Sequence, residues 1–220
     1  MKKGIIIGAG IGGLTTAIAL AQKGIQVQIY ERAIEIKEVG AGVWIAPNGM
    51  QIFDKLGIAQ EVAAAGTKLK RISVVDLNYK PISVIDGAEI EAKHQFGTIA
   101  IHRATLQQIL ASKVHPEQLH LNKAFKNYEQ NGTAVTVYFE DGSTAEADFL
   151  ICADGLKSKA RIQMHGPQNL RDSGQTCWRF ATAFDLPKEE QDNMYEVWAN
   201  TKGLRVGYSK IDDKRVYVYI

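Results

Sequence analysis

The 220-residue chain has few cysteines and no excess of charge of one sign. Its two cysteines, Cys152 and Cys177, lie far apart, and no histidine or cysteine accompanies them at the spacing of a metal site. We therefore expect neither a disulfide framework nor a metal, and a reducing compartment is indicated. The formal charge of +2 includes no basic block, so nucleic acid is not an expected partner.

Long apolar runs are also absent. No stretch is long enough to cross a bilayer, so we expect no membrane segment. The basic residues Lys2 and Lys3 before an apolar run resemble a signal peptide faintly. The run Ile5–Ile7 is too short to be the hydrophobic region of a signal peptide, so we expect a cytoplasmic protein. With 45% hydrophobic and 23% charged residues, the composition is that of a globular chain longer than one average domain.

The most informative stretch is Gly4–Glu31. Ile5–Ile7 is a short apolar β-branched run, typical of a strand buried on both faces of a parallel sheet. Leu14–Ala21 repeats apolar residues at helical spacing, and Gly24 ends that helix. Val27–Glu31 then alternates as a second strand ending in an acid. This order predicts a dinucleotide-binding βαβ unit.

Three glycines between the first strand and the helix have GxGxxG spacing. Gly8 permits a tight turn, Gly10 lets the backbone approach a pyrophosphate, and Gly13 lets helix and strand pack closely. The helix N-terminus offers unpaired N–H groups to that pyrophosphate. Glu31 can accept hydrogen bonds from both hydroxyls of an adenosine ribose, and it disfavours the 2′-phosphate of NADP. The alternative, that the glycines serve only loop geometry, is disfavoured by the strand, helix and acid in register.

Further elements follow along the chain. Glu35–Ala46 reads as a loop, and Pro47–Leu56 as a helix that ends before Gly57. Arg71–Asp76 and Ile82–Ile85 are predicted to pair as strands. Within the loop, the glycines at 40 and 42 either let the backbone pass close to a flat group or make a flexible segment.

A strand at Thr98–Ile101 delivers His102 and Arg103 to the start of a helix. An arginine at such a junction can reach a phosphate bidentately, although a solvated arginine is the simpler interpretation. His102 is better explained as a structural hydrogen-bonding residue than as a catalyst. The sequence alone leaves the role of Arg103 open.

A β-meander is predicted next. Lys123–Gln130, Ala134–Glu140 and Thr144–Phe149 are strands joined by Asn-Gly and Asp-Gly turns. The apolar run Phe149–Ala153 is expected to rejoin the parallel sheet. Asp154 then faces the crevice where such sheets bind ligands, or else caps the following helix.

Together these features resemble the FAD-dependent aromatic-ring hydroxylases, single-component flavoprotein monooxygenases that include salicylate and para-hydroxybenzoate hydroxylase-like enzymes. The resemblance rests on the glycine turn, on His102-Arg103, and on Ala153-Asp154-Gly155 with Ser158 and Arg161. Two further segments resemble the family's flavin-side loop and its substrate-domain entry: Gly40–Val43 with Pro47-Asn48, and Cys177–Arg179. The DGxxSxxR segment is the most specific of these, because many FAD and NAD proteins share the glycine fingerprint.

The resemblance implies the following cofactor contacts. The FAD pyrophosphate is held by the glycine turn, comprising Gly8, Gly10, Ile11, Gly12 and Gly13. The adenosine is bound by Glu31 with Arg32, and Ala124 faces the adenine. The flavin side is contacted by Gly42, Val43, Arg103 (phosphate or ribityl region) and Asp154 (pyrophosphate or ribityl chain), with Arg161 holding the Asp154 segment.

The resemblance also implies a reaction. NADH or NADPH reduces the flavin, and O₂ adds to it as a C4a-hydroperoxide that hydroxylates a small aromatic or related substrate. The implied fold is α/β, a Rossmann-like FAD-binding βαβ sheet with an inserted β-meander, plus part of a mostly antiparallel β substrate domain. Residues 1–71 and 98–171 are expected to form the FAD-binding part, and residues 72–97 and 172–220 the substrate domain.

One departure from the family pattern is clear. The downstream Gly-Asp motif that holds the ribityl chain in that family is absent, and Arg215–Ile220 ends within an alternating strand. We therefore expect the N-terminal half of a longer flavoprotein, with its last sheet unfinished and an oligomer possible. A non-catalytic FAD- or nucleotide-binding fragment and a flavin reductase are the alternatives, whereas a methyltransferase does not explain Asp154–Arg161. Neither the substrate, the catalytic base nor the choice of NADH or NADPH follows from the sequence.

Overall fold

The computed structural model describes residues 2–36, 40–167, 169–201 and 203–220. The chain forms two compact units, which we call the first and the second unit. The first unit comprises Met1–Lys37 and Gln107–Ser173, and the second comprises Glu38–Leu106 and Gly174–Ile220. The two units are defined by which residues pack together, whereas the predicted domains were defined by FAD binding and substrate binding. The domain assignment therefore stays a prediction.

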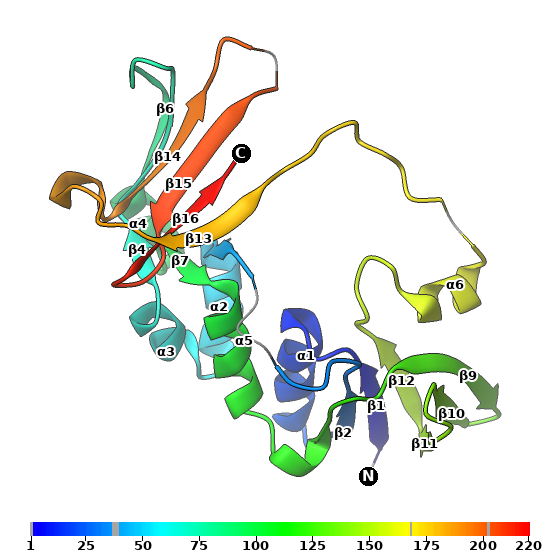
Figure 1. Ribbon diagram of the computed structural model, residues 1–220. Helices are drawn as coiled ribbons and strands as arrows, with labels where there is room; N and C mark the ends of the chain where they lie inside the picture. The colour runs from blue at the N-terminus through cyan, green and yellow to red at the C-terminus, as the bar shows by residue number, and fades with distance from the viewer. Residues whose placement is uncertain (1, 37–39, 168, 202) are drawn as a thin grey trace. The chain divides into compact units, whose positions relative to one another are not determined.

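The first unit contains a four-stranded parallel sheet in the order β12-β1-β2-β8. Figure 1 shows β12, β1 and β2 side by side. Its strands are β12 (Phe149–Cys152), β1 (Lys3–Ile7), β2 (Gln26–Tyr30) and β8 (Leu119–His120). The apolar run Ile5–Ile7 lies in β1, between β12 and β2, and each of its residues is at most 3% exposed. Helix α1 (Ile11–Ala21) connects β1 to β2. The predicted βαβ unit is confirmed.

An antiparallel meander is inserted into this unit. It consists of β9 (Phe125–Asn131), β10 (Ala134–Phe139) and β11 (Thr144–Ala147), with β10 in the middle. Apolar residues of the meander pack against Ile5 and Ile7 of β1 in one buried core, to which Phe125, Val135, Val137, Phe139 and Ala147 contribute. The meander therefore covers one face of the parallel sheet, as that sheet type requires. The following strand β12 pairs in parallel with β1, as predicted.

The second unit begins with a small sheet in the order β3-β7-β4. Its strands are β3 (Gly42–Ile45), β7 (Thr98–His102) and β4 (Thr67–Leu69), all antiparallel. The prediction that Glu35–Ala46 is a loop is wrong for residues 42–45. The glycines suggested a loop, but these residues gain their hydrogen bonds from β7, which is distant in sequence. Such pairing has no local signal.

Helices follow two of these strands. Helix α2 (Pro47–Lys55) starts with proline in its first turn, as predicted, and α3 (Ala59–Ala64) follows it. Helix α5 (Arg103–Ser112) starts directly after β7, and short 3-10 helix η1 (Pro116–Gln118) comes after α5. No described helix is both long and apolar enough to cross a membrane.

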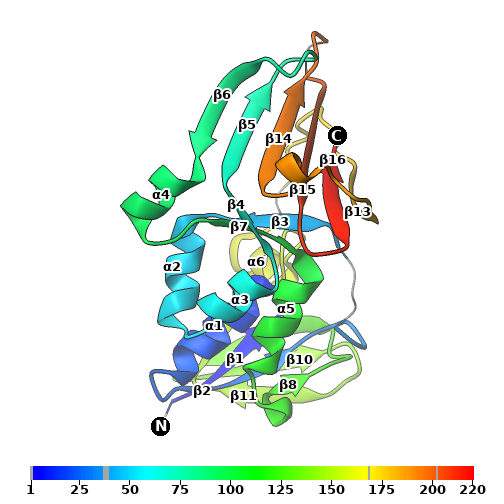
Figure 2. The same ribbon diagram turned by 90° about the vertical axis from the view of Figure 1, so that its left-hand side faces the viewer.

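A six-stranded sheet completes the second unit, in the order β13-β16-β15-β14-β5-β6 (Figure 2). The strands are β13 (Arg179–Ala183), β16 (Arg215–Tyr219), β15 (Arg205–Lys210), β14 (Asn193–Trp198), β5 (Arg71–Val75) and β6 (Pro81–Asp86). All neighbours are antiparallel except β14 and β5. Helix α4 (Gly87–His94) follows β6, and η2 (Lys188–Glu190) precedes β14. The mostly antiparallel sheet that was predicted is therefore present.

The last strand is an inner strand of its sheet. Strand β16 is hydrogen-bonded to β13 on one side and to β15 on the other. The expectation that the sheet lacks further strands stays a prediction. Beyond β16, Ile220 exchanges two backbone hydrogen bonds with Trp178. The edges of this sheet are β13 and β6, which the order of elements along the chain did not indicate.

Candidate cofactor-binding site

Two glycines of the turn between β1 and α1 are required by the fold itself. Gly8 has a φ of +101°, and a Cβ there would lie 2.5 Å from the carbonyl oxygen of Ala153. A Cβ on Gly13 would collide with the carbonyl oxygen of Gly8. Helix α1 thus packs tightly against the end of β1, and β12 passes close to the same turn.

The other two glycines face open space. Apart from the neighbouring residues and the backbone of α1 itself, no heavy atom lies within 4 Å of the Cβ position of Gly10 or of Gly12. Gly10 is the N-cap of α1, where no side chain caps the helix and no acidic residue stands in the first turn. The first amides of a helix have no intrahelical acceptor, and the helix dipole is positive at this end. This end of α1 is therefore suited to an anion.

Glu31 lies beside this turn. Its Oε2 accepts a hydrogen bond from the Ala9 amide at 2.8 Å, and its Oε1 accepts one from the Ala33 amide at 2.9 Å. An ionised carboxylate has about four acceptor positions. Each oxygen therefore keeps a position for a further donor, next to the open helix end.

The segment after β8 runs along the same corner. The amide of Asn122 donates to the carbonyl of Ala33, and that of Lys123 donates to the carbonyl of Glu31, at 2.9 and 2.8 Å. These bonds bring Ala124 close to Glu31 and Arg32. The next residue, Phe125, starts the meander strand β9. Ala124 therefore lies between the segment that follows β2 and the start of the meander.

Asp154 follows β12 at the carboxyl edge of the same sheet. The Cβ position of Gly8 is 3.3 Å from its Cα, so Asp154 adjoins the glycine turn. Its Oδ2 is 3.5 Å from the amide of Ala160, whereas its Oδ1 is buried and has no hydrogen-bond partner among the described residues. Burial and the nearby Asp154 carboxylate raise the pKa of the Cys152 thiol to about 11. A buried acceptor atom without a donor is suited to a ligand that donates a hydrogen bond.

Asp154 is not the N-cap residue of the following helix, although its Oδ2 accepts a long hydrogen bond from the Ala160 amide in the first turn of that helix. Helix α6 (Lys159–His165) is capped by Ser158, whose hydroxyl accepts a hydrogen bond from the Arg161 amide at 2.9 Å. The Arg161 guanidinium donates to the carbonyl of Leu156 at 3.1 Å and so closes the turn between β12 and α6. The serine and the arginine of the DGxxSxxR segment therefore shape the turn, and one oxygen of the carboxylate is left for a ligand.

The remaining predicted site residues lie in the second unit. The amide of Arg103 donates to the carbonyl of Ala41 at 3.0 Å, and Gly42 pairs with His102 between β3 and β7. His102 is 4% exposed, and its Nε2 lies 3.1 Å from the carbonyl oxygen of Gly40, which fits the structural role expected for it. Arg103 therefore adjoins the strand that carries Gly42 and Val43. The first unit holds the other predicted residues.

An aromatic cluster next to this strand was not predicted. A Cβ on Gly42 would collide with the ring of Tyr217. Trp44 lies edge-on to Tyr217 and Tyr219, with ring centroids 5.9 and 5.6 Å apart. The hydroxyl of Tyr219 donates to Glu196, and burial followed by that carboxylate raises the tyrosine pKa. Alternation in the last strand was visible in the sequence, but the partner strands were not.

These features define a class of protein. A parallel βαβ unit, an open glycine-lined helix end and a carboxylate after the second strand are the dinucleotide-binding arrangement of α/β proteins. The chain belongs to the family described as FAD binding domain, whose model matches residues 2–219.

Two similar proteins are a monooxygenase and a hydroxylase. The chain is 33% identical to aurachin C monooxygenase/isomerase of Stigmatella aurantiaca, over 99% of this chain and 57% of that protein. It is 34% identical to 3-hydroxybenzoate 6-hydroxylase 1 of Aquipseudomonas alcaligenes, over 89% of this chain and 51% of that protein. The chain thus spans little more than half the length of these relatives.

A solved structure agrees with this relationship. A single-residue variant of HpxO from Klebsiella pneumoniae, complexed with FAD, superposes with a TM-score of 0.89 at 28% identity, covering all of this chain and 56% of that one. HpxO has also been solved complexed with FAD and uric acid, with a TM-score of 0.88. The fold is therefore that of HpxO, a protein solved with FAD, over the matched length.

Proposed function

We propose that the first unit binds FAD and that the chain is the cofactor-binding part of an NAD(P)H-dependent monooxygenase acting on a small aromatic or related compound. The observation that carries this proposal is the convergence, at one edge of the parallel sheet, of three groups that can still form hydrogen bonds. They are the open end of α1, the free acceptor positions of Glu31, and the buried Oδ1 of Asp154. The named relatives support the reaction class.

The pyrophosphate of FAD fits the open end of α1. In this proposal the amides of Ile11, Gly12 and Gly13 donate to its oxygens, and Gly10 leaves room for it to approach the backbone. The absence of an acidic residue in the first turn of α1 removes the repulsion that a carboxylate would exert there. The open space around Gly10 and Gly12 lets the anion reach these amides.

The adenosine fits the corner formed by Glu31, Arg32 and Ala124. Each Glu31 oxygen already accepts one backbone hydrogen bond, which fixes the carboxylate and leaves acceptor positions for two ribose hydroxyls. A 2′-phosphate would meet a negative charge instead. The corner is therefore proposed to select an adenosine whose 2′-hydroxyl is unmodified.

Asp154 is proposed to accept from the ribityl chain. A carboxylate that only accepts hydrogen bonds is unfavourable beside a phosphate oxygen, but it suits a hydroxyl donor. The ribityl hydroxyls are the donors that FAD has and ADP lacks. We therefore assign the buried Oδ1 to the ribityl chain rather than to the pyrophosphate.

The second unit is proposed to serve the flavin ring and the substrate. Gly42, Val43 and Arg103 form the expected flavin-side segment, and the buried ring of Tyr217 packs against Gly42 and supports this segment from the core. FAD, when bound, supplies the redox chemistry between NAD(P)H, O₂ and that compound. The protein's part is to hold both rings and to exclude water from them. A cytoplasmic location stays a prediction.

The substitution Gly10→Ala tests the cofactor site. The added methyl group meets no atom within 4 Å beyond the neighbouring residues, and the φ of −71° suits alanine. The FAD-free protein should therefore lose no more than about 1 kcal/mol of stability, the cost of alanine at an N-cap. The methyl group would occupy the space through which the pyrophosphate approaches the backbone. We therefore expect FAD affinity to fall at least about 10-fold, which corresponds to about 1.4 kcal/mol of binding free energy. Fluorescence titration of FAD into the flavin-stripped chain measures both proteins.

Gln22→Ala is the matched control. Gln22 is exposed at the opposite end of α1, and its side chain should not affect FAD. Unchanged FAD affinity in Gly10→Ala, with the control also unchanged, would contradict the assignment of the pyrophosphate to this helix end.

A second candidate is an FAD-binding chain without turnover of its own. It is favoured by the coverage of 57% and 51% of the named relatives, because each of those proteins has a further part that this chain does not match. Oxidation of NADH or NADPH by the FAD-loaded chain distinguishes the two. Oxidation that a ring compound stimulates supports the monooxygenase, whereas a yellow protein without any oxidation supports the second candidate.

A further inference from the structure

Helix α6 is attached to the meander by one side chain. The Nε2 of Gln163 donates to the carbonyl of Tyr128 at 2.6 Å, and its Oε1 accepts from the amide of the same residue at 3.0 Å. Tyr128 lies on β9, the edge strand of the meander. A glutamine amide therefore pairs with β9 as a neighbouring strand would.

A second attachment lies at the start of α6. Lys159 Nζ is 2.6 Å from Glu140 Oε1, and that carboxylate stands in the turn after β10. Both partners are about half exposed, so the ion pair is weak in water. The glutamine, which makes two hydrogen bonds in one geometry, is the more directional of the two contacts.

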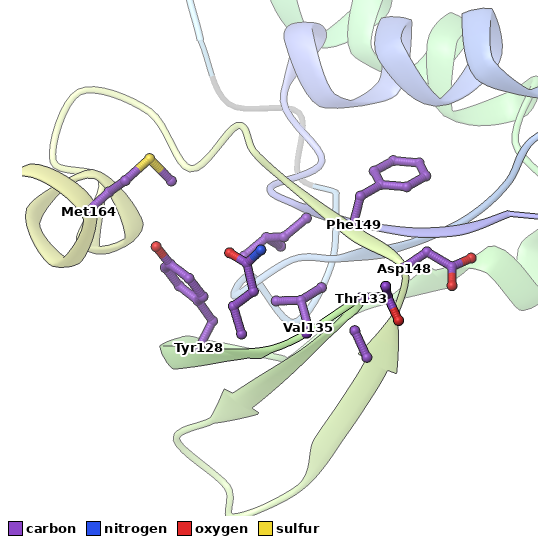
Figure 3. Close-up of a pocket in the computed structure, with 10 residues that line it drawn as sticks. Tyr128, Thr133, Val135, Asp148, Phe149 and Met164 are labelled. Carbon is purple, nitrogen blue, oxygen red and sulfur yellow. The ribbon is translucent and has the colours of Figure 1, made fainter.

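Apolar packing contributes little to the position of α6. Ala160 is its one buried residue, while Ile162 is 43% and Met164 is 52% exposed. A hollow of about 290 Å³ lies between α6, the meander and the start of β12, with Met164 on one side and Tyr128, Val135 and Phe149 around it (Figure 3). A helix of seven residues is not stable alone. Its placement therefore depends on its polar contacts.

The turn that carries Asp154 is held between two supports. At one end β12 is paired with β1, and at the other end α6 starts at Lys159. The Oδ2 of Asp154 also faces the amide of Ala160 in the first turn of α6, at 3.5 Å. A shift of α6 thus moves the carboxylate relative to the glycine turn, where Gly8 adjoins it.

We propose that Gln163 is a positioning residue for the cofactor: by binding α6 to β9, it fixes the Asp154 carboxylate where the ribityl chain of FAD donates to it. This inference rests on the proposed FAD site. The proposal predicts that loss of Gln163 weakens the binding of FAD but not of ADP, whereas a merely structural role predicts the same effect on both. ADP has no ribityl chain, so its binding at α1 and Glu31 is independent of α6.

The test compares FAD and ADP binding in the flavin-stripped full chain. In Gln163→Ala we expect FAD affinity to fall about 3- to 10-fold, because two exposed hydrogen bonds contribute only a modest net free energy. We expect ADP affinity to stay unchanged. Lys159→Met, which removes the other attachment, should act in the same direction but less. Gln60→Ala, an exposed glutamine on α3 in the second unit, should leave both affinities unchanged.

The outcomes separate the inference from the function on which it rests. An unchanged FAD affinity in Gln163→Ala overturns the positioning role, and so does an equal fall in FAD and ADP affinity, which indicates general loosening of the first unit. If the unsubstituted chain binds neither FAD nor ADP, the proposed function fails and this inference fails with it. Faster amide hydrogen exchange in α6 of Gln163→Ala, with ADP still bound, supports the inference.

Discussion

Gly10 caps the start of α1 and Gly13 lies three residues later, inside the helix, and a methyl group meets different surroundings at each. At Gly13 it collides with the carbonyl oxygen of Gly8, whereas at Gly10 it enters open space. The sequence motif predicted both positions without distinguishing a requirement of the fold from a requirement of the ligand. The distances make that distinction, and substitutions can separate the two.

We expect Gly13→Ala to lower the free energy of unfolding of the FAD-free chain by about 1–3 kcal/mol, the usual cost of an overpacked site. Alanine favours a helix over glycine by about 1 kcal/mol, which reduces the loss without removing it. Urea unfolding followed by circular dichroism measures the change. A Gly13→Ala chain as stable as the parent would show that α1 and β1 are less tightly packed than described.

At the scale of elements, the meander depends on a carboxylate at its second turn. Asp141 accepts hydrogen bonds from Lys123 Nζ at 2.6 Å, and from the hydroxyl and amide of Ser143 at 2.6 and 3.0 Å. These donors hold the pKa of Asp141 well below its ordinary value of 3.8. A carboxylate with a lowered pKa in the folded state stabilises the fold above its ordinary pKa, and this stabilisation is lost as the pH falls.

Asp141→Asn should therefore destabilise the chain at pH 7, and the difference from the parent should shrink as the pH falls through about 4. The unfolded parent takes up a proton in that range, whereas its folded form resists protonation. Urea midpoints of both proteins at pH 7 and pH 3 provide the measurement. A difference of equal size at both pH values would mean that the Lys123 and Ser143 contacts do not act through charge.

The elements that the sequence predicted have local signals. Gly24 ends α1, Pro47 starts α2, and the Asn131-Gly132 pair turns β9 into β10. The elements that it missed depend on distant partners. Strand β3 is held by β7, and β14 pairs in parallel with β5, far away in the sequence. A local pattern contains no information about such partners.

The same limit applies to the candidate site. The acid after the second strand and the acid after β12 could be found because each follows an apolar run that predicts a strand. The unpaired Oδ1 of Asp154 and the two bonds between Gln163 and Tyr128 could not, because they depend on where α6 lies against the meander. The aromatic residues around Gly42 come from different strands and had no common motif.

At the scale of the whole molecule, each unit has its own core and its own part of the proposed function. The core of the first unit lies between the parallel sheet and the meander, which carry the proposed nucleotide corner. The core of the second unit includes Leu69, Ala100, Met194, Ile211 and Tyr217, and it joins the small sheet to the six-stranded one. The first unit alone contains all the groups proposed for the ADP half of FAD.

The central claim is that the end of α1 and Glu31 bind the ADP half of FAD. Titration of the flavin-stripped, ¹⁵N-labelled chain with ADP, followed by amide chemical shifts, tests it most directly. We predict saturable shifts that are largest at Ile11, Gly12, Gly13 and Glu31. If these amides do not move while others do, or if no shift saturates, the account is contradicted.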